Sequence, residues 1–313
     1  IIVVSYLFLI FYVGIYARKY VNSFSDYMVA NRSLSLSLGV VTMLGTELGL
    51  ITVMYNAQTG INGLFSSFHI GLAAFIVTLF IGLTGFVVVE LRRLKVKSIP
   101  EYYSLRFGPK VRIVGAILLC LGGILNMGLF LKVGAIFIQS IFGIDDEGGL
   151  LALIMLILLL LVLVYTIFGG MISVIITDYI QFLILSIGFM LCIFYSIKTL
   201  GWSNIFDSLE LIMKIKNESI KDYNIDIIYN PIYNMGGAYI SWQVVLGFVS
   251  AVIWPTAITR VLSMKSTKFV KKQYIWSSFS FLIRFIIPCF LGICAFIYFN
   301  GNIQDESLAL LPK

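Results

Sequence analysis

The chain has little charge, and it has few of the residues that carry soluble enzyme chemistry. Of its 313 residues only 12% are Asp, Glu, Lys or Arg, and His69 is the single histidine. Soluble domains have about a quarter of their residues charged. With 60% hydrophobic residues and a mean hydropathy of +1.00, the sequence excludes an ordinary soluble domain and predicts an all-α membrane protein.

Cysteine is also scarce. The four cysteines lie inside apolar segments without C-x-x-C spacing, which excludes disulfides between exposed loops and a cysteine-type metal site. There is no H-E-x-x-H motif and no Ser/His arrangement in these segments, so the sequence does not predict an enzyme. The net charge is +7, but the basic residues lie in short stretches between apolar segments. A lipid bilayer therefore accounts for them, and nucleic acid is not an expected partner.

Eight apolar segments are each long enough to cross a hydrocarbon core about 30 Å thick. They are residues 1–17, 36–60, 62–91, 112–143, 149–168, 172–197, 237–262 and 274–299. The chain starts without methionine inside one segment and stops at LALLPK, where another span could follow. We therefore expect a fragment of a longer protein.

The basic residues predict an orientation. Fifteen of the 22 lysines and arginines follow the first, third or seventh segment, and Arg260 is assigned to the last of these loops. Because cytoplasmic loops carry an excess of Lys and Arg, these three loops are predicted to be cytoplasmic. The acidic residues 145–147, the loop 199–236 and both ends of the chain are then expected to lie outside.

The second apolar segment carries a carboxylate near its middle. Glu47 lies beside Gly45, Thr46 and Gly49. Charge at that depth is costly, which makes Glu47 a candidate functional residue. Glycines beside a hydroxyl and a charge favour a helix break that turns free carbonyls toward a cation, so we expect an interruption around residues 44 to 49. The alternative is a glutamate that forms a salt bridge for packing.

Other polar residues also lie within predicted spans. Asp178 lies in the sixth segment, a short distance after Gly170. At this place the dipole of the helix could stabilise an acid near the helix N-terminus, on the cytoplasmic side. Arg284 lies near the centre of the eighth segment, so it must face the bundle interior, pair with an acid or extend to the interface. Pro255 predicts a break in the seventh segment, because proline removes a helical donor.

Three motifs resemble those of the sodium:solute symporter family. They are DYMVANRSLS at 26–35, SIPEYYSLRFG at 98–108 and YTIFGGMISVIITDYIQF at 165–182. The resemblance covers residues 20 to 300, and it implies a leucine-transporter-type inverted-repeat helix bundle that binds sodium and solute near the midplane. Residues 1–313 would be one truncated transmembrane transporter domain, with an extra N-terminal helix at 1–17, the first repeat at 36–197 and the start of the second at 237–299.

The resemblance implies a site for co-transported sodium. The carbonyls of Leu44 and Glu47 and the carboxylate of Asp178 are the implied ligands, and oxygen is what a hard cation binds. The Glu47 carboxylate could join the site, pair with Arg284 or carry a proton. Family members take further ligands from a later helix, which is not within residues 1–313.

The resemblance also suggests solute-binding residues, namely Thr46, Asn126, Gln243 and Arg284. Sugar-transporting relatives have a lysine at the position of Arg284, whose planar guanidinium suits a carboxylate. An amino acid or a carboxylate is therefore expected rather than a sugar. We expect sodium-coupled symport by alternating access, in the plasma (inner) membrane. The alternatives are a symporter-like sensor or receptor module and a proton-coupled transporter.

Overall fold

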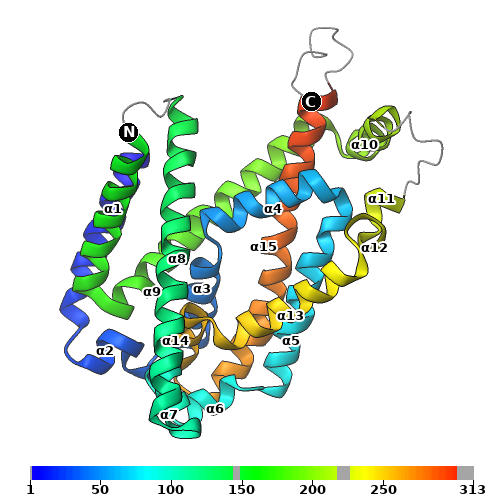
Figure 1. The fold of residues 1–313 in the computed structure, drawn as a ribbon. Helices are drawn as coiled ribbons and strands as arrows, with labels where there is room; N and C mark the ends of the chain where they lie inside the picture. Colours follow the sequence, from blue (N-terminus) through cyan, green and yellow to red (C-terminus); the bar gives the residue numbers. More distant parts are fainter. Residues whose placement is uncertain (1, 144–148, 217–225, 302–313) are drawn as a thin grey trace. The chain divides into compact units, whose positions relative to one another are not determined.

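The computed structural model describes residues 2–143, 149–216 and 226–301, and this part of the chain is helical, without a β-strand (Figure 1). The all-α class is thereby confirmed. The chain divides into two compact units. The first comprises Ile1–Ile51, Val77–Leu183 and Phe248–Ser278, and the second comprises Thr52–Ile76, Ile184–Gly247 and Phe279–Lys313. The predicted outer acidic residues 145–147 lie outside the described residues.

The helices are assigned to these units as follows. The first unit holds α1 (Ile2–Tyr16), α2 (Phe24–Val29), α3 (Leu36–Glu47), α6 (Val88–Arg93), α7 (Ile99–Phe107), α8 (Pro109–Phe142) and α14 (Pro255–Ser263). The second holds most of α4 (Leu50–Gly63) and all of α10 (Trp202–Lys216), α11 (Asp226–Tyr229) and α12 (Pro231–Met235). Both units include parts of α5 (His69–Thr84), α9 (Leu150–Leu200), α13 (Gly237–Ile253) and α15 (Thr267–Gly301).

Several helices have the length and composition of membrane spans. Four are long and apolar enough to cross a membrane on their own, namely Leu50–Thr84, Pro109–Phe142, Gly169–Leu200 and Thr267–Asn300. The bent pair α13 and α14 is a fifth when it is counted as one span. Leu36–Glu47 and Leu150–Val164 are apolar but shorter. The described residues therefore form four or five apolar spans of an integral membrane protein, and the larger number of eight stays a prediction.

Three interruptions divide the helices where the sequence has glycine or proline. Helix α3 ends at Glu47 and Leu48 leaves the helical region at φ −97° and ψ 70°, which confirms the break expected around residues 44 to 49. Trp254 separates α13 from α14 with a bend of 45°, and Pro255 begins α14, as predicted. Helix α9 is kinked at Gly170, where φ is 52° and ψ is −149°.

The end of α14 is hydrogen-bonded to Leu34, two residues before the start of α3. The Leu34 N–H donates to the Ser263 carbonyl, and the Lys265 N–H donates to the Leu34 carbonyl, both at 3.1 Å. Arg92, only 8% exposed, donates from Nε to the Met264 carbonyl at 2.6 Å and from Nη2 to the Lys265 carbonyl at 3.1 Å. These bonds satisfy carbonyls that a helix end leaves without partners, so the start of α3 and the end of α14 form one anchored group.

The predicted outer loop 199–236 is largely helical in its described part. One face of α10 is apolar and packs into the core of the second unit, because three of its side chains are almost fully buried. This core comprises Leu64, Ile205, Leu209, Ile212, Ile228, Phe290, Ile293, Cys294 and Ile297. In the same unit Asn234 donates from Nδ2 to the Gly63 carbonyl at 3.1 Å. The segment is therefore part of a packed unit rather than an open loop.

The close approach of α4 to α15 in the second unit is testable. A Cβ added to Gly60 would lie 2.1 Å from the carbonyl oxygen of Cys289, whereas a Cβ on Gly123 of α8 would meet nothing within 4 Å. Gly60→Ala in the full-length protein is expected to cost about 1–3 kcal/mol through overpacking. Gly123→Ala should stay within about 0.5 kcal/mol. Equal melting temperatures of the two detergent-purified variants would contradict the contact.

Candidate functional site

The candidate site lies in the first unit, where α3, α9 and α14 meet. Helix α3 approaches α9 at Gly45, because a Cβ there would stand 2.8 Å from the Asp178 carbonyl oxygen. A glycine at this position therefore allows the two backbones to come close. Helix α14 contacts α3 in the same unit. The approach brings polar side chains of α3 and α14 onto Asp178 of α9.

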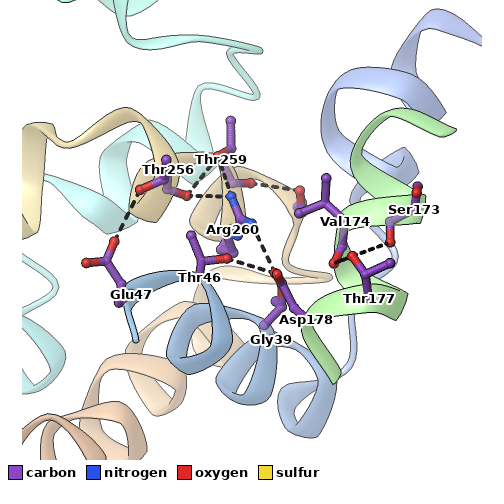
Figure 2. Close-up of polar contacts among 12 residues, drawn as sticks. Gly39, Thr46, Glu47, Ser173, Val174, Thr177, Asp178, Thr256, Thr259 and Arg260 are labelled. Atoms are coloured by element: carbon purple, nitrogen blue, oxygen red, sulfur yellow. Dashed lines mark hydrogen bonds and ion pairs between the residues drawn. The ribbon is translucent and has the colours of Figure 1, made fainter. Parts of the chain in front are cut away.

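The Asp178 carboxylate is the centre of the site. Thr42 of α3 donates to its Oδ2. Thr46 of α3 donates to the same atom at 2.7 Å, and so does Nη2 of Arg260 at 3.1 Å (Figure 2). The side chains of Arg260 and Asp178 are 6% and 8% exposed, so they form a buried ion pair. We call these four residues the Asp178 site.

These contacts contradict one of the two sequence interpretations of Asp178, that of an acid capping a helix, and the sodium interpretation stays a prediction. It does not cap a helix after Gly170, because it lies well inside α9, is 6% exposed and is bonded to α3 and α14. The assignment of Arg260 to a cytoplasmic loop was wrong: Arg260 lies in α14 and is 5% exposed. A buried carboxylate requires a cation or donors of hydrogen bonds, and Arg260 is the cation that this fold supplies.

A second set of contacts joins the two helix interruptions. Thr256, in the first turn of α14, donates from Oγ1 to Oε1 of Glu47, the last residue of α3, at 3.2 Å. Arg260 donates from Nη1 to the Thr256 carbonyl at 3.1 Å. Figure 2 shows the resulting path from Asp178 through Arg260 and Thr256 to Glu47. The two interrupted helices and α9 are therefore linked by hydrogen bonds.

The other predicted site residues are placed as follows. The Leu44 carbonyl accepts the Leu48 N–H at 2.9 Å, so helical bonding persists up to the break. Asn126 lies in α8 of the first unit. In the second unit, Gln243 donates from Nε2 to the Tyr239 hydroxyl at 2.7 Å. The guanidinium carbon of Arg284 stands 4.4 Å from the centre of the Phe281 ring. Within the first unit, hydrogen bonds connect Thr46 to Asp178 directly and Glu47 to Asp178 through Thr256 and Arg260.

Two residues of this site were missed by the sequence analysis. Thr42 precedes Thr46 by one helical turn, and side chains four residues apart share a helix face, which was a usable signal. Arg260 lies within the predicted span 237–262, so its burial could have been expected from those limits.

The donor set suits a hard monovalent ion better than a transition metal. Among the described residues, no group of three or more His, Cys, Asp or Glu side chains could hold a metal ion. Hydroxyl, carbonyl and carboxylate oxygens do gather at the Asp178 site and at the end of α3. Oxygen ligands bind ions such as sodium, so the chemistry present fits an ion that passes through the protein.

The second unit contains a cavity of its own. Its volume is about 460 Å³, and it is lined by Tyr55, Gln58, Thr59, Asn62, Met235 and Tyr239. Tyr239 is the residue to which Gln243 donates. The lining combines amide and hydroxyl groups with aromatic and methionine surface, and none of its residues is charged.

An apolar helical protein with two interrupted helices linked beside a buried ion pair has the features of a secondary transporter. The sequence profile of the sodium:solute symporter family matches residues 27–305, so the chain belongs to that family. The resemblance found from the three motifs is thereby confirmed.

Individual relatives agree with this family. A sodium/proline symporter of Staphylococcus aureus (strain bovine RF122 / ET3-1) is 25% identical over 284 residues, covering 87% of this chain and 51% of the relative. A Drosophila melanogaster protein named as a candidate sodium-dependent multivitamin transporter is 21% identical, covering 92% of this chain and 46% of the relative. The chain thus spans about half the length of these relatives.

A solved structure shows the same fold. A Na+-coupled sialic acid symporter, in a substrate-bound outward-open state, matches with a TM-score of 0.77 and 23% sequence identity. The match covers 98% of this chain and 61% of the symporter.

The buried ion pair predicts a large stability effect. Asp178→Asn leaves the Arg260 charge without its anion, so the variant is expected to lose about 3–5 kcal/mol of stability in sodium-free buffer. Glu90→Gln is the matched control, because its pair with Arg93 is exposed, with side chains 37% and 70% accessible. An exposed pair contributes about 0–1 kcal/mol. Similar losses in chemical denaturation of the two full-length variants would show that the Asp178 pair is not buried.

Proposed function

We propose that the full-length protein is a sodium-coupled symporter of a small organic solute that works by alternating access. The observation that carries this proposal is the hydrogen bond between Glu47 and Thr256, which links the interruptions of two apolar helices. Interrupted helices give up backbone hydrogen bonds, so their ends supply carbonyls and dipoles that bind ions and solutes in a membrane. Family membership supports the same function.

The proposed sodium ligands are the backbone carbonyls of Leu44 and Glu47 and the carboxylate of Asp178. The Glu47 carbonyl belongs to the last residue of α3, where the helical pattern ends. Asp178 adds a full negative charge, and Thr46 places a hydroxyl oxygen 2.7 Å from it. An ion that binds one state of the transporter better than another shifts the equilibrium toward that state, and this linkage with solute binding is reciprocal.

The proposed solute is an amino acid or a carboxylate, bound by Thr46, Asn126, Gln243 and Arg284. A guanidinium presents a planar set of donors that matches a carboxylate. The proposed bundle is of the leucine-transporter type, with about eight spans in this chain. Residues 36–197 would form its first repeat and residues 237–299 the start of its second. Both chain ends would lie outside a plasma (inner) membrane, as the distribution of basic residues indicates.

Sodium-driven uptake by the full-length protein tests the ion site. Asp178→Asn removes a proposed ligand and Glu47→Gln removes a negative charge beside the proposed carbonyl ligands, so each is expected to raise the sodium concentration for half-maximal uptake by about tenfold or more, where 1.4 kcal/mol of lost binding is tenfold in affinity. Rates are compared per folded transporter in proteoliposomes, with the exposed Glu90→Gln as control. Unchanged sodium dependence in both variants would remove these carboxylates from the mechanism.

The choice of solute rests on Arg284 and has its own test. The Arg284 guanidinium carbon stands 4.6 Å from the Phe285 ring centre, a stacking geometry that a lysine does not reproduce. Arg284→Lys is expected to weaken solute affinity by about tenfold and to leave sodium affinity within about twofold, since an Arg-to-Lys exchange at a stacked or bidentate site is not conservative. The exposed Arg93→Lys serves as control. Unaltered solute affinity in Arg284→Lys would contradict the proposed carboxylate contact.

A further inference from the structure

The contact between Arg260 and Asp178 is incomplete for a permanent ion pair. Only Nη2 of the guanidinium reaches the carboxylate, at 3.1 Å, and it reaches one oxygen. Nη1 is directed to the Thr256 carbonyl instead, and Nε is buried without an acceptor among the described residues. A guanidinium and a carboxylate bind most strongly through two parallel hydrogen bonds. Arg260 therefore binds Asp178 through one hydrogen bond, where its guanidinium could form two.

We propose that Arg260 is a tethered cation that occupies Asp178 when no free ion is bound, and that sodium displaces it during transport. The inference rests on the proposed function, because it assumes that sodium reaches Asp178. It adds that a side chain of the protein itself competes with sodium for Asp178. The free energy of breaking the Arg260 contact is then part of the sodium affinity.

Charge at the Asp178 site supports exchange rather than joint binding. Both Thr hydroxyls and Arg260 converge on Oδ2. Two unit cations near one carboxylate oxygen would repel each other strongly in a buried setting, where screening by water is weak. One carboxylate also neutralises only one of them. Sodium and the Arg260 guanidinium are therefore alternative partners of Asp178.

The anchoring of α14 gives the exchange a mechanical consequence. Arg260 belongs to α14, whose end is bonded to Leu34, which lies two residues before α3, and to Arg92 of α6. Asp178 belongs to α9, and its bond to Arg260 is an ion pair between α14 and α9. Thr42 and Thr46 of α3 are hydroxyls, which can act as ion ligands as well as donors. Replacement of Arg260 by sodium would thus release α14 from α9 while α3 keeps its oxygens at the site.

Sodium binding without solute separates this inference from a static ion pair. The melting temperature of the purified full-length protein is measured against sodium at constant ionic strength, with potassium as the replacement, at pH 8. A ligand that binds the folded state stabilises it according to its concentration and affinity, so the curve gives the half-saturating sodium concentration. Arg260→Gln is expected to lower that concentration by about tenfold or more, in line with coupling energies of close charge pairs.

Arg93→Gln is the matched control. Arg93 is also an arginine of the first unit, but its side chain is 70% exposed and donates to Glu90 at 2.9 Å. Removing it takes away the same charge without freeing Asp178, so its half-saturating sodium concentration should stay within about twofold of wild type. Arg260→Gln combined with Asp178→Asn should lose the Asp178-dependent gain in sodium affinity.

The outcomes are distinct. Unchanged or weaker sodium binding in Arg260→Gln, beside a normal sodium response of the wild type, overturns the exchange and leaves the proposed symport intact. A wild type without any sodium response or sodium-driven uptake overturns the proposed function. If Arg260→Gln does not fold, Arg260→Lys is titrated, because lysine keeps the charge but loses the planar group that binds Asp178 and Thr256 together. A drop in half-saturating sodium of about threefold or more is then expected, and no drop overturns the exchange.

Discussion

A charge buried inside a membrane protein must have a partner, and in this chain Asp178 and Arg260 meet that requirement for each other. Their side chains are 8% and 6% exposed, in a unit built from apolar helices. Separating them would leave one buried charge without compensation, at a cost of several kcal/mol. The arrangement of α3, α9 and α14 is therefore restricted to positions that keep a cation at the carboxylate.

The interrupted helices give this pair its setting. Because α3 stops at Glu47 and α14 starts at Pro255, both ends expose polar backbone groups beside polar side chains. Thr256 spans the two ends through its bond to Glu47, and Arg260 ties Thr256 to Asp178. In a low-dielectric surrounding, such connected hydrogen bonds polarise one another, so a change of the ion at one point alters the whole path.

The sequence predicts the local features of this fold well and its long-range pairing poorly. The breaks at Leu48 and Trp254 were expected because glycine and proline act on the backbone of their own helix. The pairing of Arg260 with Asp178 joins residues 82 positions apart, and nothing in the local pattern of either helix specifies its partner. Arg260 follows a proline within an apolar segment and precedes a basic loop. The positive-inside rule therefore counted it with the loop, although it belongs to helix α14.

The helical character of residues 199–216 and 226–236 shows the same limit. Its polar composition indicated a loop, yet α10 buries one apolar face in the second unit. An amphipathic helix needs only a stripe of apolar residues, and average polarity hides that stripe. Composition was therefore enough to predict a membrane protein. The residues that form the site became known only from the way the helices pack.

A cryo-EM density map of the full-length protein in sodium-free buffer would test the central claim most directly. The account predicts a helix interrupted at Leu48, with the Glu47 side chain on Thr256 and Asp178 enclosed by α3 and α14. A regular helix running from Leu36 through Gly63 without a break, with Asp178 facing lipid, would contradict it.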